Sequence, residues 1–190
     1  MANHTNRTTD ATPRLLEGLR ELAETATRTA ERIGAQVEQA YRMVRETVEG
    51  GGTLFFCGNG GSAADAQHMA TEYVVRYMKN RKAYPAVALT TDTSLLTATG
   101  NDFGFDFIFS RQVEALAKEG DLLVIHSTSG NSPNVLHAAR DGGALAKEVD
   151  HIVIIPTDRT DRAQELHLCI EHLICEIVER EVIDRGENAR

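Results

Sequence analysis

The sequence has few cysteines and no cluster of basic residues, and each of these shortages excludes a class of protein. Its 190 residues include three cysteines, Cys57, Cys169 and Cys175, which lack the C-x-x-C spacing of metal sites and lie within apolar runs. We expect them to be reduced core residues, as in a cytoplasmic protein. The formal net charge is -8, and a chain without a basic face cannot neutralise a nucleic-acid backbone. No nucleic-acid partner is therefore expected.

The sequence also lacks a long apolar segment. No stretch approaches the roughly 20 apolar residues that span a bilayer, and the polar N-terminus, through Pro13, has no apolar signal region. We therefore expect a cytoplasmic protein without a membrane partner. The length fits one domain, residues 1–190. It would comprise a disordered or frayed N-terminus (1–12), a helical segment (13–50), and an α/β core with its closing helix (51–183).

A long amphipathic helix is predicted before the core. Thr12-Pro13 is a typical helix start, and apolar residues then recur at steps of three and four up to the glycines at 50–52. The helix can break near Gly34. Because it is longer than the domain requires, we expect it to pack in a bundle shared between subunits. The alternative is that it covers a face of the sheet in its own subunit.

Three short apolar runs follow, at 53–57, 86–90 and 121–126, and each leads through a polar or glycine-rich turn into a helical pattern. Their continuous apolarity predicts parallel strands that are buried on both faces, and hence a doubly wound α/β sheet. Ligands of such sheets bind at the C-terminal ends of the strands. A fourth run, 151–155, ends at Pro156, and a closing helix is predicted over 161–183.

Two of the turns have the composition of anion-binding loops. We call residues 58–62, Gly-Asn-Gly-Gly-Ser, the glycine loop, and residues 127–132, Ser-Thr-Ser-Gly-Asn-Ser, the serine loop. Each lies between a predicted strand and a helix N-terminus, where backbone amides can bind an anion. The glycine loop alone could equally be a tight turn. The hydroxyls and amides of the serine loop can hold a phosphate without cations. We favour this function over that of a flexible linker, because a segment directly between a buried strand and a helix has no need of a linker's flexibility.

Two pairs of polar residues on different helices suggest a reactive site. His68 and Glu72 lie four residues apart, on one face of the helix that follows the glycine loop. They could ligate a metal or exchange protons, although a pair at this spacing is more often a surface pair. Gln164 and His172 lie two turns apart on the closing helix, and histidine, carboxylate and amide oxygen together suit zinc. We interpret three other histidines as ordinary core or surface residues: His126, His137 and His151.

Taken together, five segments of the chain resemble the sugar isomerase (SIS) domain family, and within it the phosphoheptose isomerases. The segments are G-N-G-G-S-A-A-D-A-Q-H-M-A-T-E from Gly58, A-V-A-L-T-T-D-T-S from Ala86, G-N-D-F-G-F from Gly100, S-T-S-G-N-S-P-N from Ser127, and the stretch from Asp161 through His172.

The resemblance implies a flavodoxin-like SIS fold, a homotetramer with active sites between subunits, and isomerisation of sedoheptulose 7-phosphate to D-glycero-D-manno-heptose 7-phosphate. It implies that Glu72 and His172 are the acid/base pair that moves a proton between adjacent carbons through an enediol. It also implies one zinc ion per subunit, held by His68, Glu72, Gln164 and His172. The implied substrate-binding residues are Asn59, Gly60, Gly61, Ser62, Glu72, Asn101, Asp102, Ser127, Thr128, Ser129, Ser132 and Gln164.

The chain departs from the family in two places. Between Arg140 and Asp141 the family usually has a further stretch, on the order of 15 to 20 residues with another parallel strand, whose loss would leave a hole in the sheet. One family strand is thus missing before the Gly-Gly-x-Leu segment at 142–145. Either the chain has a true deletion with local repacking, or a segment is absent from this sequence, and we favour the second. The other departure is His126, because the family commonly has an apolar or aromatic residue before the serine loop.

Two other functions remain open. One is a non-catalytic SIS regulatory protein that binds a replication initiator. That relative lacks the glutamate and the final histidine, so Glu72 and His172 favour an enzyme. The other is an isomerase of a different phosphosugar, since a phosphate loop is indifferent to the length of the sugar.

Overall fold

The structure, a computed structural model, describes residues 11–141 and 149–184. Residues 1–10 of the predicted N-terminal segment lie outside the described residues, as does the Gly-Gly-x-Leu segment at 142–145. The elements follow in the order α1 (Thr12–Arg32), α2 (Gly34–Gly50), β1 (Leu54–Gly58), α3 (Gly61–Val74), β2 (Ala86–Ala88), α4 (Thr93–Asp102), the 3-10 helix η1 (Phe105–Phe107), α5 (Ser110–Leu116), β3 (Leu122–His126), α6 (Pro133–Asp141) and α7 (Thr160–Asp184).

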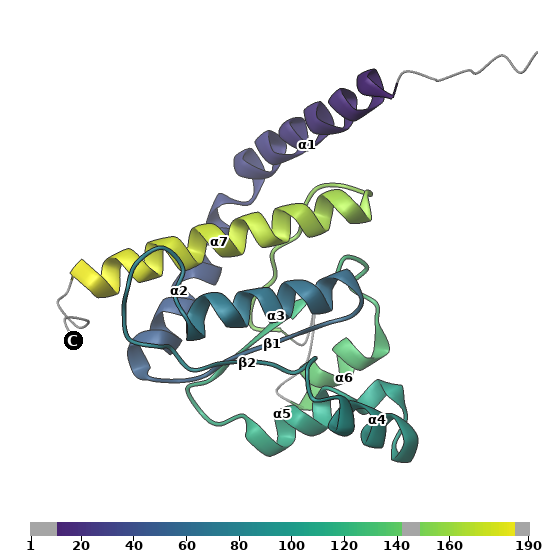
Figure 1. Ribbon diagram of the computed structural model, residues 1–190, viewed down its shortest axis with the longest axis vertical. Coiled ribbons are helices and arrows are strands. Elements are labelled where there is room, and N and C mark those ends of the chain that lie inside the picture. Colours follow the sequence, from purple (N-terminus) through teal and green to yellow (C-terminus); the bar gives the residue numbers. More distant parts are fainter. Residues whose placement is uncertain (1–10, 142–148, 185–190) are drawn as a thin grey trace, which may run out of the picture.

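The three strands form one parallel sheet in the order β2-β1-β3 (Figure 1). All five residues of the central strand β1 are buried. Side chains alternate along a strand, so Leu54 and Phe56 pack into one hydrophobic cluster and Phe55 and Cys57 into another. This burial on both faces confirms the predicted doubly wound α/β sheet.

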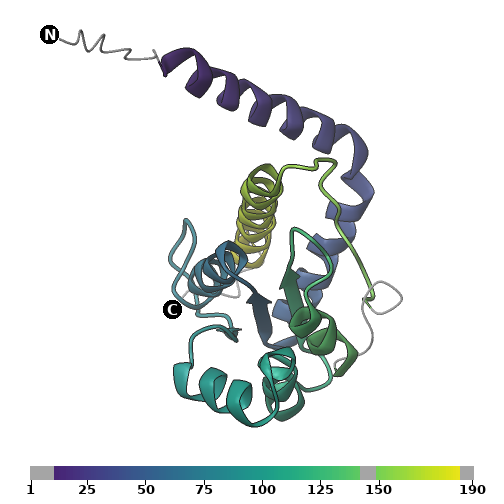
Figure 2. The same cartoon turned by 90° about the vertical axis from the view of Figure 1, so that its right-hand side faces the viewer.

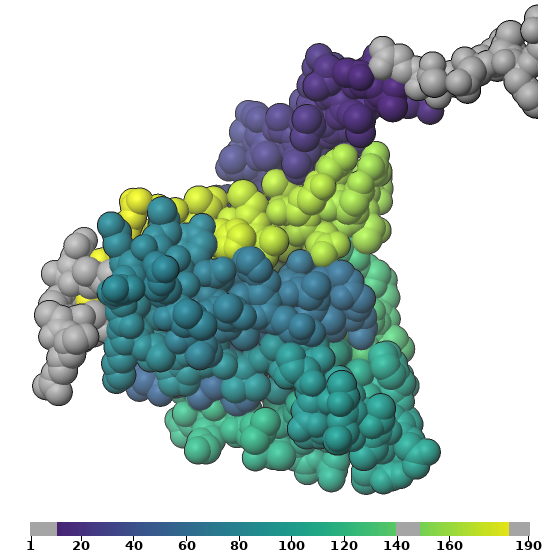
Figure 3. Space-filling view, viewed as in Figure 1, coloured from purple at the N-terminus to yellow at the C-terminus, as the bar shows by residue number. Residues whose placement is uncertain are grey.

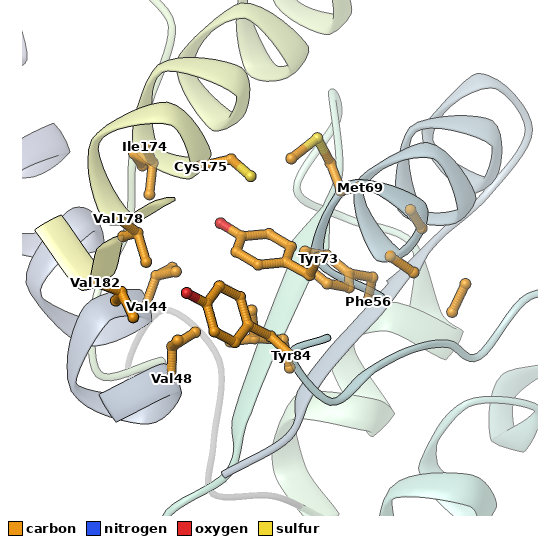
Figure 4. Close-up of a cluster of buried hydrophobic side chains, with 14 residues drawn as sticks. Val44, Val48, Phe56, Met69, Tyr73, Tyr84, Ile174, Cys175, Val178 and Val182 are labelled. Atoms are coloured by element: carbon orange, nitrogen blue, oxygen red, sulfur yellow. The ribbon is translucent and has the colours of Figure 1, made fainter. Parts of the chain in front are cut away.

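Helices cover both faces of the sheet (Figure 2). On one face, α2, α3 and α7 contribute residues such as Val44, Met69 and Val178 to a shared core (Figure 4). On the other, Val113 of α5 and Val135 of α6 pack against the sheet. In the described parts of the chain, no helix is both long enough and apolar enough to cross a bilayer.

The N-terminal helical segment is broken, as predicted. Ile33 leaves the helical conformation (φ -114°, ψ 16°) and is buried against Ile155, Ala163 and Leu166. On the N-terminal side of the break, α1 projects from the body of the molecule (Figures 1 and 3). The first part of its apolar stripe is uncovered in this chain, with Leu15, Leu16 and Leu19 exposed, whereas Leu22 and Ala26 pack against the cluster that contains Ile33.

The fourth apolar run, 151–155, is not a strand. Its first residue, His151, contacts the carbonyl oxygen of Gln36 through Nε2 at 2.6 Å, and its last, Ile155, packs beside Ile33. These contacts hold the run on the helices, so it is not paired with the sheet. Helix α6 passes through Arg140 into Asp141 without a break.

The cysteines are free, but they do not all lie in the core. Cys57 and Cys175 are buried as predicted, whereas Cys169 is exposed. An apolar run on a helix has an outer face, and position 169 lies off the buried stripe that contains Leu166 and Ile174.

Candidate active site

Three side chains that could bind one metal ion meet between α3 and α7. His68 and Glu72 lie one turn apart on α3, and His172 comes from α7, which packs along α3. The Nε2 atoms of His68 and His172 are 2.8 Å apart, and Glu72 Oε1 lies 3.3 Å from His68 Nε2. One ligand atom from each residue lies within 4.8 Å of the others. The His68 side chain is 46% exposed and that of Glu72 18%, so a substrate can reach these atoms.

The His172 ring is held on one side by Tyr77. The two rings stack with centroids 5.4 Å apart and an interplanar angle of 20°. Burial is the main factor that raises the pKa of the Tyr77 hydroxyl, which stays neutral at physiological pH. Because α3 ends at Val74, Tyr77 lies in the segment after the helix, where it can face α7.

The C-terminal end of α3, which carries Glu72, is fixed by a buried ion pair. Arg81 donates hydrogen bonds to the carbonyl oxygens of Glu72 (2.6 Å) and Tyr73 (2.8 Å), which the helix itself leaves without partners. Its Nε donates to Glu179 Oε1 at 3.0 Å, and the two side chains are 0% and 1% exposed. Glu179 also accepts hydrogen bonds from the backbone amides of residues 77–79. No periodic pattern in the sequence predicts this pair.

The glycine loop lies next to Gln164 of α7. A Cβ atom on Gly61 would come within 2.6 Å of the Gln164 amide, so only glycine permits this approach. The amide nitrogen of Gln164 donates to Asp65 Oδ1 at 3.1 Å. Gln164 is thus hydrogen-bonded to Asp65, which lies one turn before His68 on α3.

The serine loop begins beside the glycine loop, because the register of the sheet pairs Gly58 with His126. The amide side chains of Asn59 and Asn134 exchange two hydrogen bonds of 2.8 Å and thereby join the glycine loop to the first turn of α6, directly after the serine loop. Within the serine loop, Ser127 Oγ accepts from the Gly130 amide at 2.9 Å. Hydroxyls and amides thus gather at the N-terminus of α6, an arrangement that suits an anion.

A second histidine–glutamate pair lies beneath this loop. His126 Nε2 is 2.6 Å from Glu171 Oε1, and the side chains are 4% and 15% exposed. Burial lowers the pKa of His126, but the charge and hydrogen bond of Glu171, together with the charge of Asp65, outweigh burial and raise the pKa overall. Burial lowers the pKa of nearby His167, and the charge of His126 lowers it further. His126 is a core histidine, as predicted, and its acidic partner is the new finding.

Comparison with known proteins identifies the family. The SIS domain family matches residues 19–156. Phosphoheptose isomerase from Aliarcobacter butzleri is 45% identical over 174 residues, which cover 84% of this chain and 92% of that protein. The enzyme of the same name from Citrifermentans bemidjiense is 48% identical over 170 residues, which cover 82% and 88%. The chain belongs to the phosphoheptose isomerase family. It is therefore an isomerase and not a purely regulatory SIS protein.

Solved structures of the phosphoheptose isomerase family confirm the fold. The enzyme from Neisseria gonorrhoeae superposes with a TM-score of 0.81 at 37% identity, over 89% of this chain and 98% of that one. The enzyme from Francisella tularensis gives a TM-score of 0.84 at 30% identity, over 90% and 100%.

The same comparisons bear on the missing family segment. The alignment with the Aliarcobacter phosphoheptose isomerase has 174 positions, whereas the matched 84% of this 190-residue chain is only about 160 residues. Some positions of that relative therefore have no counterpart here.

The structure brings most of the predicted site residues to one region of the phosphoheptose isomerase fold. His68, Glu72 and His172 converge, and both loops lie at the C-terminal ends of neighbouring strands. Asn101 and Asp102 lie elsewhere, at the end of α4, whose main contact is with η1. Their side chains hydrogen-bond to each other at 2.7 Å. No described contact joins them to the three converging residues.

Proposed function

We propose that the chain is a cytoplasmic phosphoheptose isomerase that interconverts sedoheptulose 7-phosphate and D-glycero-D-manno-heptose 7-phosphate. The observation that carries the proposal is the convergence of His68, Glu72 and His172, close to two anion-binding loops. The names of the relatives, all phosphoheptose isomerases, support the choice of sugar.

The proposed reaction needs one phosphate site, one base and one acid. The serine loop holds the phosphate, and Glu72 removes a proton from C1 of the ketose as His172 gives a proton to the carbonyl oxygen on C2. The result is an enediol. Glu72 then returns a proton to C2 while the hydroxyl on C1 gives its proton back to His172, which forms the aldose. Acid/base groups placed in this way accelerate such transfers by about 10² to 10⁴.

The donor set of the site fits zinc, since two imidazole nitrogens and a carboxylate oxygen are typical zinc ligands. We propose that His68, Glu72 and His172 hold one zinc ion per subunit, with Gln164 as a fourth ligand. When bound, zinc would polarise the oxygens of the substrate. An imidazole nitrogen that binds a metal cannot carry a proton, so His172 Nε2 cannot bind zinc and donate a proton to the substrate at the same time. Zinc analysis of the purified protein, with His68→Ala expected to lose the metal, tests the ligand set independently of activity.

The exposed apolar stripe of α1 supports the proposed homotetramer with active sites between subunits. Leu15, Leu16 and Leu19 project from the body of the molecule, and packing against α1 of other copies would remove them from water. Light scattering should give the mass of four chains. Leu15→Glu with Leu19→Glu should give smaller species.

The direct test of the proposed function is to incubate the purified protein with sedoheptulose 7-phosphate, with and without a chelator, and to follow the products by NMR. We expect the manno-heptose phosphate to form, and Glu72→Gln to slow its formation by roughly 10³-fold. Glu114→Gln is the matched control, because Glu114 is an exposed residue of α5 that pairs with Arg111. No aldose from the wild type would refute the proposal, and faster turnover of a pentulose or hexulose phosphate would favour another phosphosugar.

A further inference from the structure

We propose that His126 and Glu171 are a positioning pair that sets the distance between the phosphate-binding loop and the acid/base residues. The inference rests on the proposed function, which assigns phosphate binding to the serine loop and proton transfer to Glu72 and His172. The pair would touch neither end of the substrate. It would act through the residues that follow it.

Each partner of the pair lies next to one of the two subsites in the chain. His126 is the last residue of β3 and immediately precedes Ser127, the first residue of the serine loop. Glu171 immediately precedes His172 on α7. The 2.6 Å contact between the two side chains therefore connects the start of the serine loop with the part of α7 that carries His172. A shift of the strand end relative to α7 would have to break this contact.

Neighbouring side chains hold the pair in one arrangement. The His126 ring stacks on Phe56 of the central strand, with centroids 6.2 Å apart and an interplanar angle of 12°. Asp65 of α3 and His167 of α7 lie near enough to act on its charge. At 4% and 15% exposure, the two partners have little water to exchange with. A buried, charged hydrogen bond of this kind is stronger and more directional than one in water.

Stability alone does not require an ion pair at this place. Apolar side chains of similar volume are often as stabilising as a buried ion pair, or more so. A pair with fixed hydrogen-bond geometry, in contrast, specifies how a strand end and a helix lie relative to each other. That relation matters for a substrate that must reach both subsites, since a misplacement of about 1 Å can cost 10²-fold in rate.

The test compares a ligand that needs one subsite with a ligand that spans both. Inorganic phosphate occupies only the serine loop. The heptitol 7-phosphates made by reducing sedoheptulose 7-phosphate can span both subsites but cannot react. Calorimetry gives the dissociation constant of each ligand for the wild type, for Glu171→Gln, and for the double variant His126→Leu with Glu171→Leu. The double variant leaves no buried charge without its partner, and melting curves verify that it is folded.

We expect the double variant to bind inorganic phosphate with the dissociation constant of the wild type. Its dissociation constant for the heptitol phosphates should rise by about tenfold or more, and its kcat should fall by a similar factor. Glu171→Gln keeps an acceptor for His126 and should restore both values. Unchanged heptitol affinity in the folded double variant, or loss of inorganic phosphate binding in the variant or the wild type, would overturn the inference. Failure of the wild type to turn over sedoheptulose 7-phosphate would refute the proposed function instead, and the binding comparison would still decide the role of the pair.

Discussion

The molecule contains two histidine–glutamate pairs near α7, and they differ in almost every physical respect. His68 and Glu72 lie on the same helix, with 3.3 Å between their nearest atoms, and are 46% and 18% exposed. His126 and Glu171 come from a strand and a helix, approach to 2.6 Å, and are 4% and 15% exposed. The open pair can exchange protons with a substrate or bind an ion. The two glutamates are covered to a similar degree, but the His126 ring is almost fully buried, so we expect the hydrogen bond of the closed pair to orient the elements that it joins.

The largest expected effect is on the open pair. Glu72→Gln should lower kcat by roughly 10³-fold, because the amide cannot accept the proton of the substrate. The melting temperature should hardly change, since the pair is partly solvated and contributes little to stability. Initial rates and melting curves check both statements, with Glu114→Gln as the matched control. Near-normal turnover by Glu72→Gln would remove Glu72 from the mechanism.

The next effect concerns the closed pair and should appear in stability. Glu171→Leu should lower the free energy of unfolding by about 3 kcal/mol, because it leaves the His126 ring buried without its acceptor. Adding His126→Leu should recover most of this loss, since no uncompensated polar ring then remains. Urea denaturation measures both variants. Additive losses in the double variant would show that the two residues do not act as a pair.

The contribution of His126 to stability should also depend on pH. The folded state raises the pKa of His126, so the stability that it contributes is fully present below the unfolded pKa of about 6.5 and is lost as pH rises through the folded value. Asp65, Glu171 and His167 face this group, and His167 has a lowered pKa and acts in the opposite direction. The difference in unfolding free energy between the wild type and His126→Gln should therefore be larger at pH 5 than at pH 9. A difference that grows as pH rises would contradict this.

The smallest effect should come from the exposed histidine. His68→Gln should change the free energy of unfolding by less than about 1 kcal/mol in metal-free protein, because surface ion pairs contribute little. The same variant should lose bound zinc if the metal proposal is right. Urea denaturation with a chelator measures the stability term. A loss as large as that of Glu171→Leu would mean that the open pair is structural.

The strands and loops could be predicted because they depend on local patterns. The apolar run at 53–57 is buried on both sides as β1, and its glycine loop opens a helix as predicted. The convergence of His68 and Glu72 with His172 required only that two amphipathic helices pack side by side. Helical spacing and the resemblance to a family were sufficient for that.

The remaining features depend on tertiary partners that spacing cannot show. Arg81 and Glu179 are 98 residues apart in sequence, and nothing local marks them as a fully buried pair. Glu171 follows an apolar run on a helix, a position where a glutamate is ordinarily on the surface. The run at 151–155 has strand composition, but its contacts with Gln36 and Ile33 keep it on the helices.

The central claim is that Glu72 and His172 move a proton between neighbouring carbons of the sugar. Running the reaction on sedoheptulose 7-phosphate in deuterium oxide tests this most directly, with the product examined by NMR. Because the site is open to solvent, the account predicts deuterium on C2 of the aldose formed by the wild type, and product formation by Glu72→Gln that is slower by roughly 10³-fold. Aldose without deuterium, formed at an undiminished rate by Glu72→Gln, would contradict it.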